Sequence, residues 1–166
     1  MALKLEDKKL VVEEVSAIVA KSVSVVIAEY RGLTVEQMTN LRSKARESEV
    51  VIRVVKNTLA RKALQGSPFE DLAGSLVGPV VLAFSTNELS AAARVAKDFK
   101  KQNDVFVVKA LSIGSGALDV SQLDMVAALP TYDEAIGKLM YVMKAPVEKL
   151  ARTMTALKEQ KESEAA

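Results

Sequence analysis

The chain contains no cysteine and no histidine, and these two absences remove most common catalytic and metal-binding chemistry. Without cysteine, disulfide bonds and thiolate metal sites are excluded. Without histidine, Ser-His-Asp triads, histidine-ligated zinc and imidazole acid–base catalysis are excluded as well. Carboxylate pairs such as Glu13-Glu14 and Asp133-Glu134 lie on expected helices, where they are predicted to face water. We therefore expect no catalytic residue, no metal, no cofactor and no small-molecule substrate.

Aromatic residues and long apolar runs are also scarce. Because the 166 residues include only 4 Phe and 3 Tyr, we expect no stacking platform for single-stranded bases. Any nucleic acid should therefore be bound through the backbone and shape of a folded RNA or a duplex. The longest uncharged run, Leu72–Asn87, is too short to span a bilayer and contains a proline, so we expect no membrane partner.

Positive charge is concentrated in the first part of the chain, although the formal net charge is only +2. Residues 1–66 hold 12 Lys and Arg against 8 Asp and Glu, whereas residues 67–130 hold 5 against 7. The excess comes mainly from Arg31, Arg42, Lys44, Arg46, Arg53, Lys56, Arg61 and Lys62. Clustered positive charge is typical of phosphate binding, and the alternative is a set of solvated helix faces.

Hydrophobic periodicity and turn residues predict an alternation of helices and strands over the first 130 residues. Helices are expected at Leu5–Lys21, at 35–48 behind a Thr34 N-cap with Gln37 in the capping-box position, at 58–65 behind an Asn57 or Thr58 cap, at 69–72, at Leu89–Lys101 and at Ser121–Ala128. Strands are expected at Ser22–Glu29, Val50–Val55, Val77–Phe84 and Val105–Leu111. Pro79 indicates that the third strand starts late or lies at a sheet edge.

This order is β-α-β, an insertion, then β-α-β, which predicts an α+β fold with a ferredoxin-like antiparallel sheet and helices on one face. Added helices and a long C-terminal amphipathic helix complete the prediction. Residues 1–130 should form the globular domain and residues 131–166 an appendage, with the boundary near Pro130. Alternate strand residues should face the core, namely Val25, Ile27, Ile52, Val54, Val81 and Ala83.

Two basic turns, each between a strand and a helix start, are the best candidates for binding phosphate. In Tyr30-Arg31-Gly32-Leu33-Thr34, glycine permits close approach and Arg31 can form two parallel hydrogen bonds to a phosphate. The second turn runs from Arg53 to Lys62, where free N–H groups at a helix start favour an anion and Lys56 adds charge. The two turns could form one phosphate-binding edge; the alternative is a pair of ordinary strand-to-helix turns.

A third candidate, Gly114-Ser115-Gly116, matches neither the Walker A spacing nor the dinucleotide fingerprint. We expect a hairpin turn over Ile113–Leu118 there rather than a phosphate loop.

The C-terminal region from Ala135 carries an apolar stripe at helical spacing. Val147, Leu150, Ala151, Met154 and Leu157 lie on one side, and mostly charged residues lie on the other. The preceding segments already suffice to close a core. The stripe is therefore predicted to bind another protein rather than to fold back onto its own domain.

Five segments resemble, in order, the bacterial ribosomal protein L-ten family, which lies at the base of the large-subunit stalk. They are YRGLTVEQMTNLR, VVKNTLARKAL, LVGPVVLAF, AAARVAKDF and LPTYDEAIGKLMYVMKAP. The resemblance covers nearly the whole chain, and its RGLT and VKNTL motifs are the most specific.

This resemblance implies a structural adaptor rather than an enzyme, located on the ribosome in the cytoplasm. Its core would bind 23S ribosomal RNA beside ribosomal protein L-eleven, and its terminal helix would carry dimers of the acidic stalk protein that recruit translational GTPases. By motif, the rRNA-binding residues are Arg31, Gly32, Lys56, Asn57, Thr58 and Arg61. The stalk-protein-binding residues are Leu139, Met143, Val147, Leu150, Met154 and Leu157. The resemblance also implies repression of the protein's own messenger RNA.

Pro146 is expected to interrupt the stripe and to start a second helical segment. The two blocks, Leu139–Met143 and Val147–Leu157, would then bind one dimer each, giving two dimers and four stalk-protein copies. Two alternatives remain at this stage. One is a free-standing RNA-binding translational regulator that dimerises through its terminal helix, and the other is a small phosphate-transfer enzyme that uses the basic turns.

Overall fold

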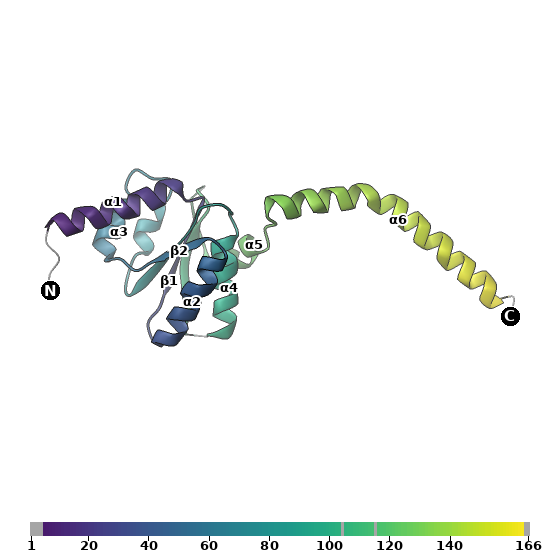
Figure 1. Ribbon diagram of the computed structural model, residues 1–166, viewed down its shortest axis with the longest axis horizontal. Coiled ribbons are helices and arrows are strands. Elements are labelled where there is room, and N and C mark those ends of the chain that lie inside the picture. The colour runs from purple at the N-terminus through teal and green to yellow at the C-terminus, as the bar shows by residue number, and fades with distance from the viewer. Residues whose placement is uncertain (1–4, 104, 115, 165–166) are drawn as a thin grey trace. The chain divides into compact units, whose positions relative to one another are not determined.

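The computed structural model describes residues 5–103, 105–114 and 116–164 (Figure 1). The chain divides into two compact units, Met1–Leu129 and Pro130–Ala166. The first contains a sheet with its covering helices, and the second contains one long helix. Within the described residues, no helix combines the length and apolar character that crossing a membrane requires.

In the part of the chain that the structure describes, five strands form one antiparallel sheet in the order β2-β3-β1-β4-β5. The strands are β1 (Ser24–Glu29), β2 (Val50–Arg53), β3 (Val80–Ser85), β4 (Val107–Ser112) and β5 (Ala117–Leu118). The first four follow the split β-α-β order, which confirms the predicted α+β fold class. β4 and β5 form the expected hairpin, with Leu111 opposite Leu118; Ser115 in its loop lies outside the described residues.

Helices cover both faces of this sheet, so the prediction of helices on one face was wrong. The helices of this unit are α1 (Leu5–Lys21), α2 (Val35–Glu47), α3 (Asn57–Leu64), η1 (Glu70–Ser75), α4 (Ala91–Gln102), η2 (Val120–Gln122) and α5 (Leu123–Ala127), where η marks a 3₁₀ helix. α1 and α3 lie side by side over one face with η1 (Figure 1), and α2, α4 and α5 pack on the other. The segments between β2 and β3, together with α1, supply the second layer.

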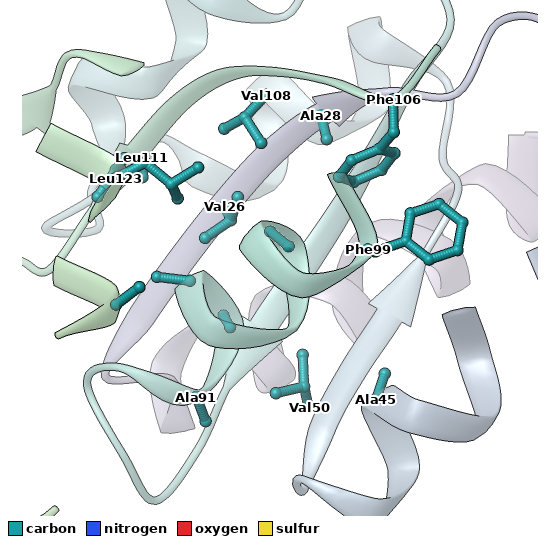
Figure 2. Close-up of a cluster of buried hydrophobic side chains, with 14 of the residues drawn as sticks. Val26, Ala28, Ala45, Val50, Ala91, Phe99, Phe106, Val108, Leu111 and Leu123 are labelled. Atoms are coloured by element: carbon teal, nitrogen blue, oxygen red, sulfur yellow. The ribbon is translucent and has the colours of Figure 1, made fainter. Parts of the chain in front are cut away.

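The core beneath α2 and α4 is built from small helical residues and larger strand residues. Ala92, Ala93 and Ala96 let α4 approach the sheet closely, and Val26 and Val108 fill the space from the strands. Figure 2 shows the end of this cluster, where two aromatic rings, Phe99 and Phe106, meet edge to face with centroids 5.1 Å apart.

Because both faces are covered, consecutive residues of the inner strands are buried and the predicted alternation fails. Val25 and Ile27 belong to the core under α1 and α3, whereas Val26 and Ala28 belong to the core under α2 and α4. Val81 is buried, Ile52 and Ala83 are partly buried, and Val54 lies beyond the end of β2 with 44% of its surface exposed. The prediction for Val54 was therefore wrong.

Strand ends also differ from the prediction, mostly by one to three residues. β1 begins at Ser24 rather than Ser22, β2 ends at Arg53 rather than Val55, and β4 runs from Val107 to Ser112. β3 begins at Val80, directly after Pro79, and pairs on both sides with β2 and β1. Pro79 thus delays the strand start, and the alternative of an edge strand is excluded.

α5 is fastened to α4 by polar contacts at its end. Arg94 donates from Nε to the Ala127 carbonyl oxygen at 3.2 Å and from Nη2 to the Leu129 carbonyl oxygen at 2.7 Å. Lys97 lies 3.0 Å from the Asp124 carboxylate, and this hydrogen-bonded ammonium lowers the pKa of Asp124. The expected helix over Ser121–Ala128 is shorter in the structure, because its first turn is the 3₁₀ helix η2.

The second unit is the single helix α6 (Tyr132–Glu164), drawn as one bent helix in Figure 1. The predicted long C-terminal helix is confirmed, but Pro146 lies inside it, so the prediction that a second helical segment starts there was wrong. Proline has no N–H to donate to the Val142 carbonyl, which removes one hydrogen bond without ending the helix. A 33-residue helix retains enough other bonds to continue through that position.

Candidate RNA-binding edge and helical docking surface

The two basic turns lie at the same edge of the sheet. β1 and β2 both run antiparallel to β3, which lies between them, so their C-terminal ends point the same way. Beyond β1, the Tyr30 N–H donates to the Pro79 carbonyl oxygen at 3.3 Å. One hollow is bordered by Tyr30 and Thr34 from the first turn and by Val54 from the second. The topology thus brings together two motifs, residues 30–34 and 53–62, that are separated by 18 residues in the sequence.

The first turn is held in a defined conformation. Gly32 has φ +87°, and a Cβ added there would lie 2.9 Å from Cγ1 of Val105. The following Thr34 caps α2 in the predicted capping box, in which Thr34 Oγ1 accepts from the Gln37 N–H and Gln37 Oε1 accepts from the Thr34 N–H. Arg31 projects from this turn, is exposed, and has no side-chain partner among the described residues. Its guanidinium is therefore available to an external anion.

The second turn leads directly into α3. Lys56 occupies the N-cap position with extended backbone, and its side chain is exposed. Thr58 is also exposed, and within the described part of the chain neither side chain has a hydrogen-bond or ion-pair partner. The prediction that Asn57 or Thr58 caps α3 was wrong, because the cap is Lys56 and it makes no side-chain cap bond.

Asn57 and Arg61, one turn apart on α3, bind the chain's own backbone. The Asn57 amide donates to the Gly78 carbonyl oxygen at 2.9 Å. Arg61 donates from Nη2 to the Leu76 carbonyl oxygen at 2.8 Å and from Nε to the Ala73 carbonyl oxygen at 3.2 Å. Both side chains therefore hold the loop that enters β3.

Lys109 of β4 holds the same loop from the other side. Its Nζ donates to the Val77 carbonyl oxygen at 2.7 Å and lies 2.9 Å from the Glu29 carboxylate. The pattern of basic residues alone did not distinguish these internal contacts from phosphate-binding positions. The distinguishing signal is spatial, because Asn57, Arg61 and Lys109 each donate to a backbone carbonyl in residues 73–78, which are distant in sequence.

A further concave surface, about 600 Å³ in volume, borders the outer strand β2. Its lining consists of Arg42, Arg46 and the continuous segment Val50–Val54. These arginines contributed to the predicted basic excess but were not among the predicted site residues.

The predicted docking stripe of α6 is exposed along its whole length. Leu139, Met143, Val147, Leu150, Met154 and Leu157 each expose between 53% and 73% of their surface. Met154 and Leu157 also border a shallow hollow with Lys158 and Lys161. Side chains of this size are usually buried, so a continuous exposed row of them is a candidate docking surface.

The start of α6 is fixed by its own sequence. The Thr131 N–H donates to Glu134 Oε2 at 3.1 Å, and the Glu134 N–H donates to Thr131 Oγ1 at 3.3 Å. This reciprocal pair is a capping box, so the Thr-x-x-Glu of the LPTYDEA motif defines where the helix begins.

Two family models together match most of the chain. The model described as ribosomal protein L10 matches residues 3–101, and the model described as the ribosomal protein uL10 C-terminal region matches residues 129–166. The chain belongs to the ribosomal protein L10 family. The prediction of a non-enzymatic ribosomal protein of the large subunit is thereby confirmed.

Curated relatives agree over the full length. The large ribosomal subunit protein uL10 of Hydrogenovibrio crunogenus is 65% identical over 166 residues, covering 100% of both chains. The uL10 of Legionella pneumophila (strain Corby) is 55% identical over 154 residues, or 93% of this chain and 87% of the relative. The uL10 of a Marinomonas species is 51% identical over 166 residues, covering 100% of both.

Proposed function

We propose that this L10-family chain is an adaptor at the base of the large-subunit stalk. Its first unit binds 23S ribosomal RNA beside ribosomal protein L-eleven, and α6 anchors dimers of the acidic stalk protein, which recruit translational GTPases in the cytoplasm. The observation that carries this proposal is the exposed apolar row on α6, within the segment matched by the uL10 C-terminal region model.

RNA contact is assigned to the edge where the two basic turns meet. Arg31 and Lys56 are exposed cations at that edge without internal partners in the described residues, as phosphate binding requires. Gly32 keeps the first turn free of a side chain, and Thr58 offers a hydroxyl beside Lys56. Asn57 and Arg61 contribute by fixing the loop behind this edge, and the remaining N–H groups of Arg61 can still reach a phosphate.

Protein contact is assigned to the two blocks of the α6 stripe. Each apolar side chain of this size contributes about 1.5–3 kcal/mol when fully buried by a partner, and the stripe supplies two such side chains in the proximal block and four in the distal block. The blocks Leu139–Met143 and Val147–Leu157 lie on either side of Pro146, where the helix loses one backbone hydrogen bond. Two blocks give two dimers and four copies, and the polar residues after Leu157 offer no third block.

Native mass spectrometry of the full chain, mixed with the acidic stalk protein of Hydrogenovibrio crunogenus, tests this function. The expected complex contains four stalk-protein copies, and a chain ending at Pro146 should retain two. Six copies, or four copies on the shortened chain, would contradict the two-block assignment.

The same measurement on the chain with and without the stalk protein separates the adaptor from the RNA-binding regulator. A regulator that dimerises through α6 should form a homodimer that the stalk protein does not displace. An adaptor should bind the stalk protein as a single copy of the chain.

A further inference from the structure

The outer edge of β2 is flanked by three arginines that come from both faces of the sheet. On α2, Leu41 and Ala45 are buried, and Arg42 and Arg46 follow each of them by one position. This places the two arginines beside the buried stripe, on the side of the helix that borders β2. Arg53 ends β2 two residues after Val51, so the two side chains share one face of the sheet. Val51 packs toward α1 and α3, and Arg53 therefore lies on the face opposite α2.

Two other charged residues near the groove, Lys44 and Glu49, make side-chain contacts that point away from it. Lys44 of α2 donates to Gln102 of α4 at 2.7 Å, so it faces away from the groove. Glu49 accepts a hydrogen bond from Asn87 and lines a separate hollow with Glu47 and Glu88. The groove lining therefore contains three basic residues, four apolar residues and no acid. Among the described residues, none of the three arginines has an ion-pair or hydrogen-bond partner for its side chain.

The groove is continuous with the end of the sheet where the first basic turn follows β1. Arg42 and Val54 line both the groove and the hollow beneath Tyr30 and Thr34. A bound chain that contacts Arg31 at the turn can therefore extend along β2 toward Arg46. β2 is the last strand of the described sheet on that side, so backbone groups along its free edge can donate to the same ligand.

We propose that this groove, formed by Arg42, Arg46, Arg53 and the free edge of β2, binds the sugar–phosphate backbone of ribosomal RNA. The proposal rests on the RNA-binding function proposed above and extends its surface by three residues. Planar guanidinium groups form paired hydrogen bonds to phosphate, and three of them at one edge match a polyanion better than a neutral strand. Charged residues at a sheet edge also discourage strand addition, which argues against an extended peptide as the occupant.

The test uses the full chain and in vitro transcribed 23S RNA of Hydrogenovibrio crunogenus, with binding measured between about 50 and 200 mM salt. The variant Arg42→Gln/Arg46→Gln/Arg53→Gln should weaken binding at least about tenfold near 100 mM salt and lower the salt slope by roughly two to three. The matched control is Lys8→Gln/Lys9→Gln/Lys21→Gln on α1, which also removes three charges from exposed side chains. It should change the slope by less than about one.

A charge-preserving variant separates phosphate recognition from general attraction. Arg42→Lys/Arg46→Lys/Arg53→Lys should keep the salt slope near that of the parent but bind several-fold more weakly, because lysine lacks the planar pair of donors. Thermal unfolding of each variant verifies that the fold is intact. If a triple variant unfolds, the three corresponding single variants, Arg→Gln or Arg→Lys, replace it.

Three outcomes overturn the groove assignment. The glutamine variant could bind RNA as the parent does, or the α1 control could lose as much affinity. The glutamine variant could also self-associate with unchanged RNA affinity. The arginines would then serve only to prevent pairing of β2 with a strand of another molecule. Failure of the proposed function looks different, because the parent chain itself would then prefer 23S RNA no more than 16S RNA of the same organism.

Discussion

Nη2 of Arg61 donates a hydrogen bond to the carbonyl oxygen of Leu76 at 2.8 Å, joining α3 to the loop that precedes β3. Leu76 is itself fully buried, so this contact fixes the backbone that enters the central part of the sheet. The arginine of the VKNTLARKAL motif therefore has an internal task that its sequence context did not reveal.

Replacing Arg61 should accordingly reduce stability. Arg61→Ala removes donors from the Leu76 and Ala73 carbonyl oxygens, and we expect a loss of about 1–2 kcal/mol in the free energy of unfolding. Urea unfolding measures this loss, and Lys62→Ala, next to it on α3 and without a partner among the described residues, is the control. A stable Arg61→Ala variant whose RNA salt slope falls by about one would show that Arg61 acts mainly on phosphate.

Arg31 and Lys56 should behave in the opposite way. Both are exposed, so Arg31→Ala and Lys56→Ala should leave the free energy of unfolding nearly unchanged. Each should weaken binding to 23S RNA and lower the salt slope by roughly one, because one phosphate contact is lost. RNA binding measured across a salt series tests this, with Lys9→Ala on α1 as the control. Curves identical to that of the parent for both variants would exclude this edge.

Gly32 is required by its backbone conformation and by its neighbour. Gly32→Ala should cost about 1–2 kcal/mol for the positive φ, and the contact with Val105 should add to this cost. Gly114→Ala is the matched control, since Gly114 has φ +83° but no atom within 4 Å of an added Cβ. Urea unfolding should show the greater loss for Gly32→Ala, and Val105→Ala should reduce that excess. Equal losses at the two glycines would mean that the Val105 contact has no energetic weight.

Two isoleucines of the same sheet, one on an inner strand and one on the outer strand, test the account of the core. Ile27 is 0% exposed between β3 and β4, whereas Ile52 on the outer strand β2 is only partly buried. Ile27→Ala should cost about 2–5 kcal/mol, and Ile52→Ala should cost clearly less because solvent already reaches its side chain. The same deletion at both sites makes the difference in urea midpoint directly comparable. A larger loss at Ile52 would contradict the position of β2 at the sheet edge.

Local patterns predicted the element order, the capping box at Thr34 and the hairpin after β4, because each depends on residues close in sequence. They failed where the outcome depends on distant contacts. The strand residues around Ile27 could not show that α1 and α3 cover the second face, and helix propensity could not show that α6 continues through Pro146. Likewise, the VKNTL motif gave no sign that Asn57 binds the Gly78 carbonyl, since the two are joined only by the fold.

The distal block of α6 should be separable from the proximal block by point substitution. Leu150 and Met154 lie one turn apart in the exposed row, so Leu150→Ser/Met154→Ser removes the apolar centre of the distal block without altering Pro146. We expect the complex with the acidic stalk protein to fall from four copies to two in native mass spectrometry. The matched change Leu139→Ser/Met143→Ser in the proximal block should also leave two copies, and the combined variant should leave none. If either double variant lost all copies, the two blocks would form one cooperative site rather than two, because a dimer on one block would then require a dimer on the other.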